Sequence, residues 1–393
     1  MAALGPGFGR RTGYVDALRR VRDPLLLLAT PLGVGLLIVF VAYGNTWPIG
    51  FDFRGTLWEP ARSLLDGTPI YPKPTREAVM VGNPTVYPPL FIVASVPLAF
   101  LPVAVASWLW FVVLAGSVVA AMWIVGVRDW RCHVIAVTSP VVVHGLYFGN
   151  LTIVLVLLVA LAWRFRNEAP LAGGALGIAI AAKLFVAPLL VWLLLTRRFR
   201  AAAWCAATAV VLVLGAWAIV GGEGLRDYPA LIRALQDVYA TRSFSVSTVA
   251  GSLDASVTAA VLAAAIAGAA CLAVATWLVR RADGDRRAFT AALTACVVGS
   301  PIVWPNYAAL LFVPIAATWP RLAPAWFFGY AIWLAGLAPK AQAEEVCCRP
   351  PDVVEETWLS IHTQPLPWVA SATIAIVAIV GGATAAVVRE RSS

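Results

Sequence analysis

Asp52 is the acidic residue that the sequence places best for chemistry at a membrane surface. It stands between Phe51 and Phe53, shortly after the first apolar stretch at 24–43. Nearby aromatic rings and the membrane remove water from a carboxylate and raise its affinity for protons, which suits a general base. Such a base could take the proton from an acceptor hydroxyl group while that oxygen attacks a sugar. The structural alternative is a carboxylate that pairs with Arg54 or caps the following helix.

Further polar residues interrupt or border apolar stretches and are candidates to bind substrate. Lys183 lies inside GIAIAAKLFVAPLL, and an ionisable residue within a membrane span is costly and often functional. The alternative is that its ammonium group snorkels to the interface. His144 and Asn150 would donate to phosphate or sugar oxygens, or else serve as a hydrogen-bonded core histidine and a helix cap. Trp304 and Asn306 would stack on and hydrogen-bond a sugar, or else form a turn within an aromatic belt.

The elements that position these residues are predicted to be membrane-spanning helices. The chain has 393 residues, of which 61% are hydrophobic and 12% are charged, whereas a soluble domain carries about 25% charged residues. Long apolar stretches recur, and they do not alternate as the strands of a membrane β-barrel do. We therefore predict an all-α, polytopic integral membrane protein that forms a single domain over 1–393, with about 12 transmembrane helices.

Basic clusters between the apolar stretches predict the side of the membrane that each loop occupies. Both ends of the chain, including the tail 1–23, are expected in the cytoplasm. Loops on the outer face are expected at 44–86, 221–250 (with a helix that lies in the interface) and 339–366. The proline-rich residues 87–102 either cross as a short span or dip into the membrane and return, and the second option keeps more basic clusters inside. On that option, the polar candidates in the first half of the chain lie on the same face as Asp52.

The remaining spans follow from the same apolar stretches. They are predicted near 103–127, 132–148, 151–165, 168–182, 184–196, 200–220, 254–279, 288–303, 306–320, 323–338 and 368–387.

Several classes of function lack support in the sequence. The net charge is +9, but the basic residues sit between apolar stretches and indicate topology and anionic headgroups, not nucleic acid. The adjacent Cys347 and Cys348 lack a CxxC metal spacing, and the other cysteines are predicted to be core residues, so no metal site and no cofactor is predicted. No P-loop, GxGxxG after a strand, HExxH or GxSxG pattern is present.

Five motifs occur along the chain in a fixed order. They are FDF with the spacing ARSLLDGTPIYP, YPPLFIVASVPLAFLP, HGLYFGNLTIVL, AIAAKLFVAPLLVWLLLTRRFR and SPIVWPNYAALLFVP. Together they resemble glycosyltransferase family 87. The resemblance runs over most of residues 45–320, and the ordered set is more specific than any one motif.

The resemblance implies a GT-C-type enzyme in the bacterial cytoplasmic (inner) membrane, with its active site on the periplasmic face. It implies that a polyprenyl-phosphate carrier donates a sugar, typically mannose, to a lipid-linked or glycan acceptor. It further implies inversion at the anomeric carbon, Asp52 as the general base, no nucleotide-sugar site and no metal. Tyr87, the first residue of the YPPL motif, is added to the candidates to bind substrate. The full set is Arg54, Tyr87, His144, Asn150, Lys183, Trp304 and Asn306.

Two positions depart from the family pattern. Asn150 stands where members often carry glutamine after the glycine, and Asn306 stands in a region where members often carry histidine. A histidine partner for Asp52 would then have to be His144 or His362.

A multi-span transporter or lipid flippase is the alternative from another functional class, because it too would have many spans and buried charge. The sequence shows no inverted repeat, and this favours the enzyme. A catalytically inactive subunit on the same scaffold is a third possibility.

Overall fold

A computed structural model describes residues 30, 33, 34, 49–80 and 83–336 of the chain. The predicted span 24–43, apart from residues 30, 33 and 34, lies outside the described residues, as do the predicted span 368–387, the tail 1–23 and the loop 339–366. The cysteine pair and His362 belong to that loop and lie outside them as well.

All regular structure in the described part of the chain is helical, as predicted for an all-α protein. The first of these helices follow directly on the predicted membrane exit before Asp52. In chain order the elements are α2 (Phe51–Phe53), η1 (Arg54–Trp58), α3 (Glu59–Leu65), α4 (Arg76–Met80), α5 (Leu90–Ala94), α6 (Val96–Ala99), α7 (Val103–Val125), α8 (Trp130–Thr138), α9 (Pro140–Phe148), α10 (Thr152–Arg164), α11 (Ala169–Ala182), η2 (Leu184–Val186), α12 (Pro188–Leu195), α13 (Phe199–Val220), α14 (Gly222–Tyr239), α15 (Val246–Gly251), α16 (Val257–Leu278), α17 (Gly284–Val298), η3 (Pro305–Leu311), α18 (Phe312–Thr318), η4 (Pro324–Phe327) and α19 (Phe328–Gly336).

Three helices of the described part, α7, α13 and α16, are long and apolar enough to cross a membrane. Helices α9 and α10 would make a fourth span together, but they meet at a bend of 120°. The predicted number of about 12 spans is therefore not confirmed. Breaks divide the other apolar stretches into shorter helices, since residues such as Pro188 and Pro305 lack the backbone N–H that a continuous helix needs. Residues 87–102 form the two short helices α5 and α6, and neither is long enough to cross.

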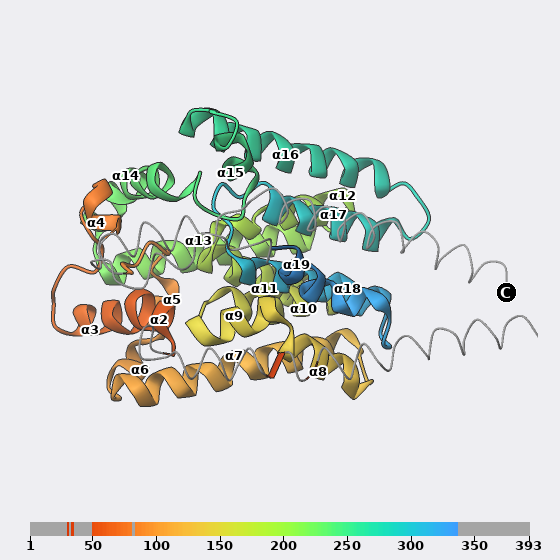
Figure 1. Cartoon of the computed structure of the whole chain (residues 1–393), viewed down its shortest axis with the longest axis horizontal. Helices are drawn as coiled ribbons and strands as arrows, with labels where there is room; N and C mark the ends of the chain where they lie inside the picture. The colour runs from red at the N-terminus through yellow and green to blue at the C-terminus, as the bar shows by residue number, and fades with distance from the viewer. Residues whose placement is uncertain (1–29, 31–32, 35–48, 81–82, 337–393) are drawn as a thin grey trace, which may run out of the picture.

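The long helices lie roughly along one axis of the molecule, and the short helices that carry Asp52 collect at one end. Figure 1 shows α2, α3, α4 and α14 at that end and α8 and α18 at the other. Between the ends, α10 packs on α7 and α11, α11 packs on α13, and α16 packs on α17. The helix predicted within 221–250 is α14. Leu231 and Val238 on its apolar face contact Val79 of α4 and form a small core of their own.

Helices α10 and α11 form a central hairpin. A cluster of ionic contacts lies at the end of this hairpin where the two helices are connected. Asp285 accepts from Arg166 at 2.9 Å and from Arg198 at 2.7 Å, and Nε1 of Trp192 donates to the same carboxylate at 2.9 Å. Helix α10 has 13 residues, and at 1.5 Å per residue it spans about 20 Å. The hairpin therefore separates this arginine-rich end from Asn150 and Lys183, which border its other end.

Candidate active site

Asp52 lies in the short helix α2, which is held against α9 and α7. The N–H of Gly50 donates to the carbonyl oxygen of Tyr147 at 2.7 Å. The ring of Phe53 is fully buried and stacks on Trp110, with ring centroids 5.3 Å apart. These contacts fix the backbone on both sides of Asp52 and leave its carboxylate partly exposed to a cavity.

The segment after Asp52 winds as a π-helical turn, η1, a rare form that often occurs at functional sites. The hydroxyl group of Thr56 donates back to the carbonyl oxygen of Asp52 at 2.5 Å. Gly55 is required here, because a Cβ atom at this position would lie 2.4 Å from the carbonyl oxygen of Asn83. The close approach brings Nδ2 of Asn83 to 3.0 Å from Oδ1 of Asp52.

Asn150 reaches the site because the sequence ends α9 abruptly. Gly149 has a φ of +73°, and the N–H of Asn150 donates to the carbonyl oxygen of Gly145 at 2.8 Å, which is the Schellman pattern that stops a helix. A Cβ atom on Gly149 would lie 2.8 Å from Cβ of Phe53, so the turn packs directly on α2. The amide Nδ2 of Asn150 then donates to Oδ2 of Asp52 at 2.6 Å.

The oxygen of the Asn150 side chain fixes the direction in which the amide points. It accepts from the backbone N–H of Thr152 at 3.0 Å and from Nζ of Lys183 at 3.3 Å. With both lone pairs of the oxygen occupied, the NH₂ group faces Asp52. Asn150 therefore caps the first turn of α10, as its structural alternative predicted, and it also links the carboxylate to the ammonium group.

Lys183 occupies the break between α11 and η2 and is 4% exposed. Besides Asn150, its Nζ donates to the hydroxyl groups of Thr152 at 2.9 Å and Tyr307 at 3.4 Å. It also lies 4.4 Å from the ring centroid of Tyr87 and 4.7 Å from that of Tyr307, where the ring faces stabilise a cation. The side chain does not snorkel to the surface, and its three N–H groups all have partners. Its contact with Asn150 connects it to Asp52.

The surroundings of Asp52 pull its proton affinity in opposite directions. Burial raises the pKa of Asp52 above its ordinary value. The hydrogen bond from Asn150, the charge of Lys183 and the hydrogen bond from Asn83 each act to lower that pKa. A carboxylate with a raised affinity for protons is suited to act as a general base when it is ionised.

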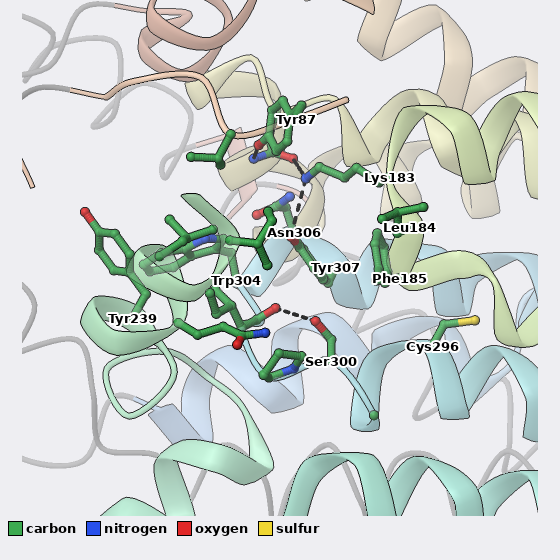
Figure 2. Close-up of a pocket in the computed structure, with 18 of the residues that line it drawn as sticks. Tyr87, Lys183, Leu184, Phe185, Tyr239, Cys296, Ser300, Trp304, Asn306 and Tyr307 are labelled. Atoms are coloured by element: carbon green, nitrogen blue, oxygen red, sulfur yellow. Dashed lines mark hydrogen bonds between the residues drawn. The ribbon is translucent and has the colours of Figure 1, made fainter. Parts of the chain in front are cut away.

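These residues line a cavity of about 670 Å³. Figure 2 shows Lys183 between Tyr87 and Tyr307, with Asn306 and then Trp304 beside them on the wall. The rest of the wall is largely apolar and comes from η2, α12, α14, α16 and α17. The predicted site residues that line the cavity are Asp52, Tyr87, His144, Asn150, Lys183, Trp304 and Asn306.

Arg54 is the predicted residue that lies outside this lining. Its side chain is exposed and donates to Oε1 of Glu59 at 2.8 Å. The partners of the Asp52 carboxylate among the described residues are Asn83 and Asn150, and neither is a histidine. His144 lines the cavity next to Phe148, with ring centroids 4.7 Å apart.

The sequence did not single out Asn83, Thr152 or Tyr307. Asn83 had one signal, since it is a polar residue directly before Pro84, but nothing in the sequence pairs it with Asp52. Thr152 and Tyr307 lie within motifs whose neighbouring residues were selected. The described residues contain no group of three or more His, Cys, Asp or Glu side chains that could hold a metal ion.

Comparison with protein families places the chain in a known family. The model for glycosyltransferase family 87 matches residues 85–305, which is more than half of the chain. The matched region contains Asn150, Lys183 and Trp304 and ends before Asn306, and Asp52 lies outside it. No curated protein and no solved structure matches the chain.

Proposed function

The chain belongs to glycosyltransferase family 87, and we propose that it moves a sugar from a polyprenyl-phosphate carrier to a lipid-linked or glycan acceptor, with Asp52 as the general base. The family and the membrane-length helices make it a membrane glycosyltransferase. The observation that carries the proposal is the chain of contacts from Asp52 through Asn150 to Lys183, set in the wall of an otherwise largely apolar cavity.

The proposed reaction is a single displacement. The acceptor oxygen forms a bond to the anomeric carbon as its proton passes to the Asp52 carboxylate. The bond between that carbon and the carrier phosphate breaks, and the phosphate leaves with the electron pair. Asp52 is the only carboxylate among the described residues that line the cavity. A retaining mechanism uses a second carboxylate about 5 Å away, so the lining supports inversion.

The base is proposed to be oriented and kept ionised by Asn150, Asn83 and Lys183. The two amides donate to different oxygens of Asp52, and these bonds fix the plane of the carboxylate. The charge of Lys183 favours the ionised base and would also stabilise negative charge that develops on the leaving phosphate. His144 and Tyr87 line the same cavity and are proposed contacts for that phosphate or the sugar. We propose no role in transfer for Arg54.

The distribution of polar groups supports the proposed carrier and the proposed side of the membrane. The apolar walls from α12, α16 and α17 suit a hydrocarbon chain, and the polar wall suits a phosphate and a sugar. The arginine-rich end lies about 20 Å from the site along α10, and positively charged ends remain in the cytoplasm. The proposed site therefore faces the outside of a bacterial inner membrane, and mannose is the proposed sugar by resemblance to the family.

The test is sugar transfer by the purified protein in liposomes with polyprenyl-phosphate mannose as donor. We expect Asp52→Asn to abolish turnover. The matched control is Asp66→Asn, because Asp66 is an exposed carboxylate at the end of α3 and lies outside the cavity lining. Turnover that survives in Asp52→Asn would refute the role of the base. A wild-type protein that moves lipid across the bilayer without consuming a panel of such donors would support the flippase instead.

A further inference from the structure

Asn306 presents an unpartnered carboxamide at the wall of the cavity. Asn306 lies in the first turn of η3 and is 0% exposed. Neither its Nδ2 nor its Oδ1 has a hydrogen-bond partner among the described residues. Burying an unsatisfied donor and acceptor destabilises a fold, and a residue that lines a cavity can be satisfied by what enters that cavity.

Asn306 combines an unpartnered, buried side chain with a place in the cavity lining. Thr85, Ser247 and Thr294 also have buried hydroxyl groups without a partner in the described part of the chain, but they do not line the cavity. Gly145 makes room for Asn306, since a Cβ atom on Gly145 would lie 3.0 Å from Cβ of Asn306.

The two unsatisfied atoms define the chemistry of the group that they can bind. Nδ2 needs an acceptor and Oδ1 needs a donor. Neighbouring hydroxyl groups of a sugar supply both, whereas an ionised phosphate only accepts and would leave Oδ1 unsatisfied. Trp304 lies on the same wall and meets Tyr239 edge to face, with ring centroids 6.1 Å apart. Figure 2 shows Asn306 between this aromatic pair and Lys183.

We propose that Asn306 binds a pair of neutral hydroxyl groups on the transferred sugar and so contributes to sugar selection. The inference rests on the proposed function, and it assigns the sugar, not the carrier phosphate, to the wall between Trp304 and Lys183. Asn306 is thus a specificity residue, and the near-isosteric Asn306→Leu removes its donor and acceptor together.

The experiment measures thermal unfolding of the purified full-length protein with farnesyl phosphate and, separately, with farnesyl-phosphate mannose, glucose or galactose. The additional stabilisation by the sugar is the unfolding temperature with a farnesyl-phosphate sugar minus the unfolding temperature with farnesyl phosphate. We expect it in the wild type for at least one hexose and expect its loss in Asn306→Leu and Asn306→Ala, with a Kd weaker by about tenfold or more. The stabilisation by farnesyl phosphate alone should remain.

Thr294→Val is the matched control, because it removes a buried unpartnered hydroxyl group outside the cavity. Without ligand, both Asn306→Leu and Thr294→Val should unfold at temperatures no lower than the wild type, since each removes an unsatisfied polar group. Thr294→Val should keep the additional stabilisation by the sugar. If Asn306→Leu also keeps it, or instead loses the response to farnesyl phosphate, the inference is wrong while the proposed function stands. If the wild type responds to none of these ligands, the proposed function fails and the inference fails with it.

Discussion

Replacing Asn150 by alanine tests the central contact of the site. The substitution removes the Nδ2 donor that lies 2.6 Å from Oδ2 of Asp52. That donor favours the ionised carboxylate, so its loss raises the pKa of Asp52 above the already raised value. A general base works only when it is ionised. The acid limb of the pH–rate profile should therefore move to higher pH.

The size of the shift follows from the strength of the lost bond. A hydrogen bond to a charged group contributes about 1.5–3 kcal/mol, and one pKa unit corresponds to about 1.4 kcal/mol. Asn150→Ala should then move the acid limb upward by about 1–2 pH units. Asn83→Ala should move it in the same direction by less, because the Asn83 contact is longer, at 3.0 Å, and makes a smaller contribution to lowering the pKa of Asp52.

The assay is kcat/KM for sugar transfer in liposomes as a function of pH, whose acid limb reports the free enzyme. Asn167→Ala is the control, since Asn167 is exposed at the arginine-rich end, where it accepts from Arg198 at 3.2 Å. Its profile should match the wild type. An Asn150→Ala profile that keeps the wild-type acid limb, with only a lower plateau, would show that Asn150 does not set the ionisation of Asp52 and would refute the reasoning.

Three more outcomes are expected. Lys183→Met should lower kcat/KM by at least about tenfold, because the oxygen of Asn150 loses its charged donor, worth about 1.5–3 kcal/mol; unchanged kinetics would exclude that link. Gly149→Ala should lower the unfolding temperature, since alanine is strained at φ +73° and its Cβ would meet Phe53 at 2.8 Å. Asp285→Asn should lower the unfolding temperature by weakening contacts to two arginines but leave kcat/KM unchanged, and a change in kcat/KM would contradict the separation of the two ends.

The sequence singled out most of the polar residues that the structure brings to one cavity, but it did not predict their contacts. Asp52 and Asn150 are 98 positions apart. Both were selected because a polar side chain at the border of an apolar stretch often has a specific role. Their direct bond was not predicted, because it depends on the bend after Gly149 and on the packing of that turn against Phe53. The pairing of Asp52 with Arg54 failed for a local reason: residues two apart on a helix do not face each other. Arg54 instead contacts Glu59 across the π-helical turn.

The apolar stretches predicted where helices lie, but not how many cross the membrane. Helix α7 (Val103–Val125) and helix α13 (Phe199–Val220) agree closely with the predicted spans 103–127 and 200–220. Hydropathy cannot show that a stretch such as 132–148 is divided, because the break at Ser139 leaves its composition apolar. The breaks at Gly149 and Lys183 are also where the site forms. This agrees with the rule that irregular backbone at membrane depth is tolerated where protein or a cavity surrounds it.

Among the described residues no histidine is bonded to Asp52, and the structure shows which groups take that place. A histidine partner would supply a hydrogen-bond donor and a charge from one ring. Here the two roles are divided, because Asn150 supplies the donor and Lys183 supplies the charge one contact further away. An amide does not ionise, so Asp52 keeps its donor at every pH at which the protein is folded. Lys183 is then the ionisable neighbour of Asp52, and its charge lowers the pKa of the carboxylate. Lys183→Met should therefore also move the acid limb of the pH profile to higher pH, and an acid limb that stays in place would contradict this division of roles.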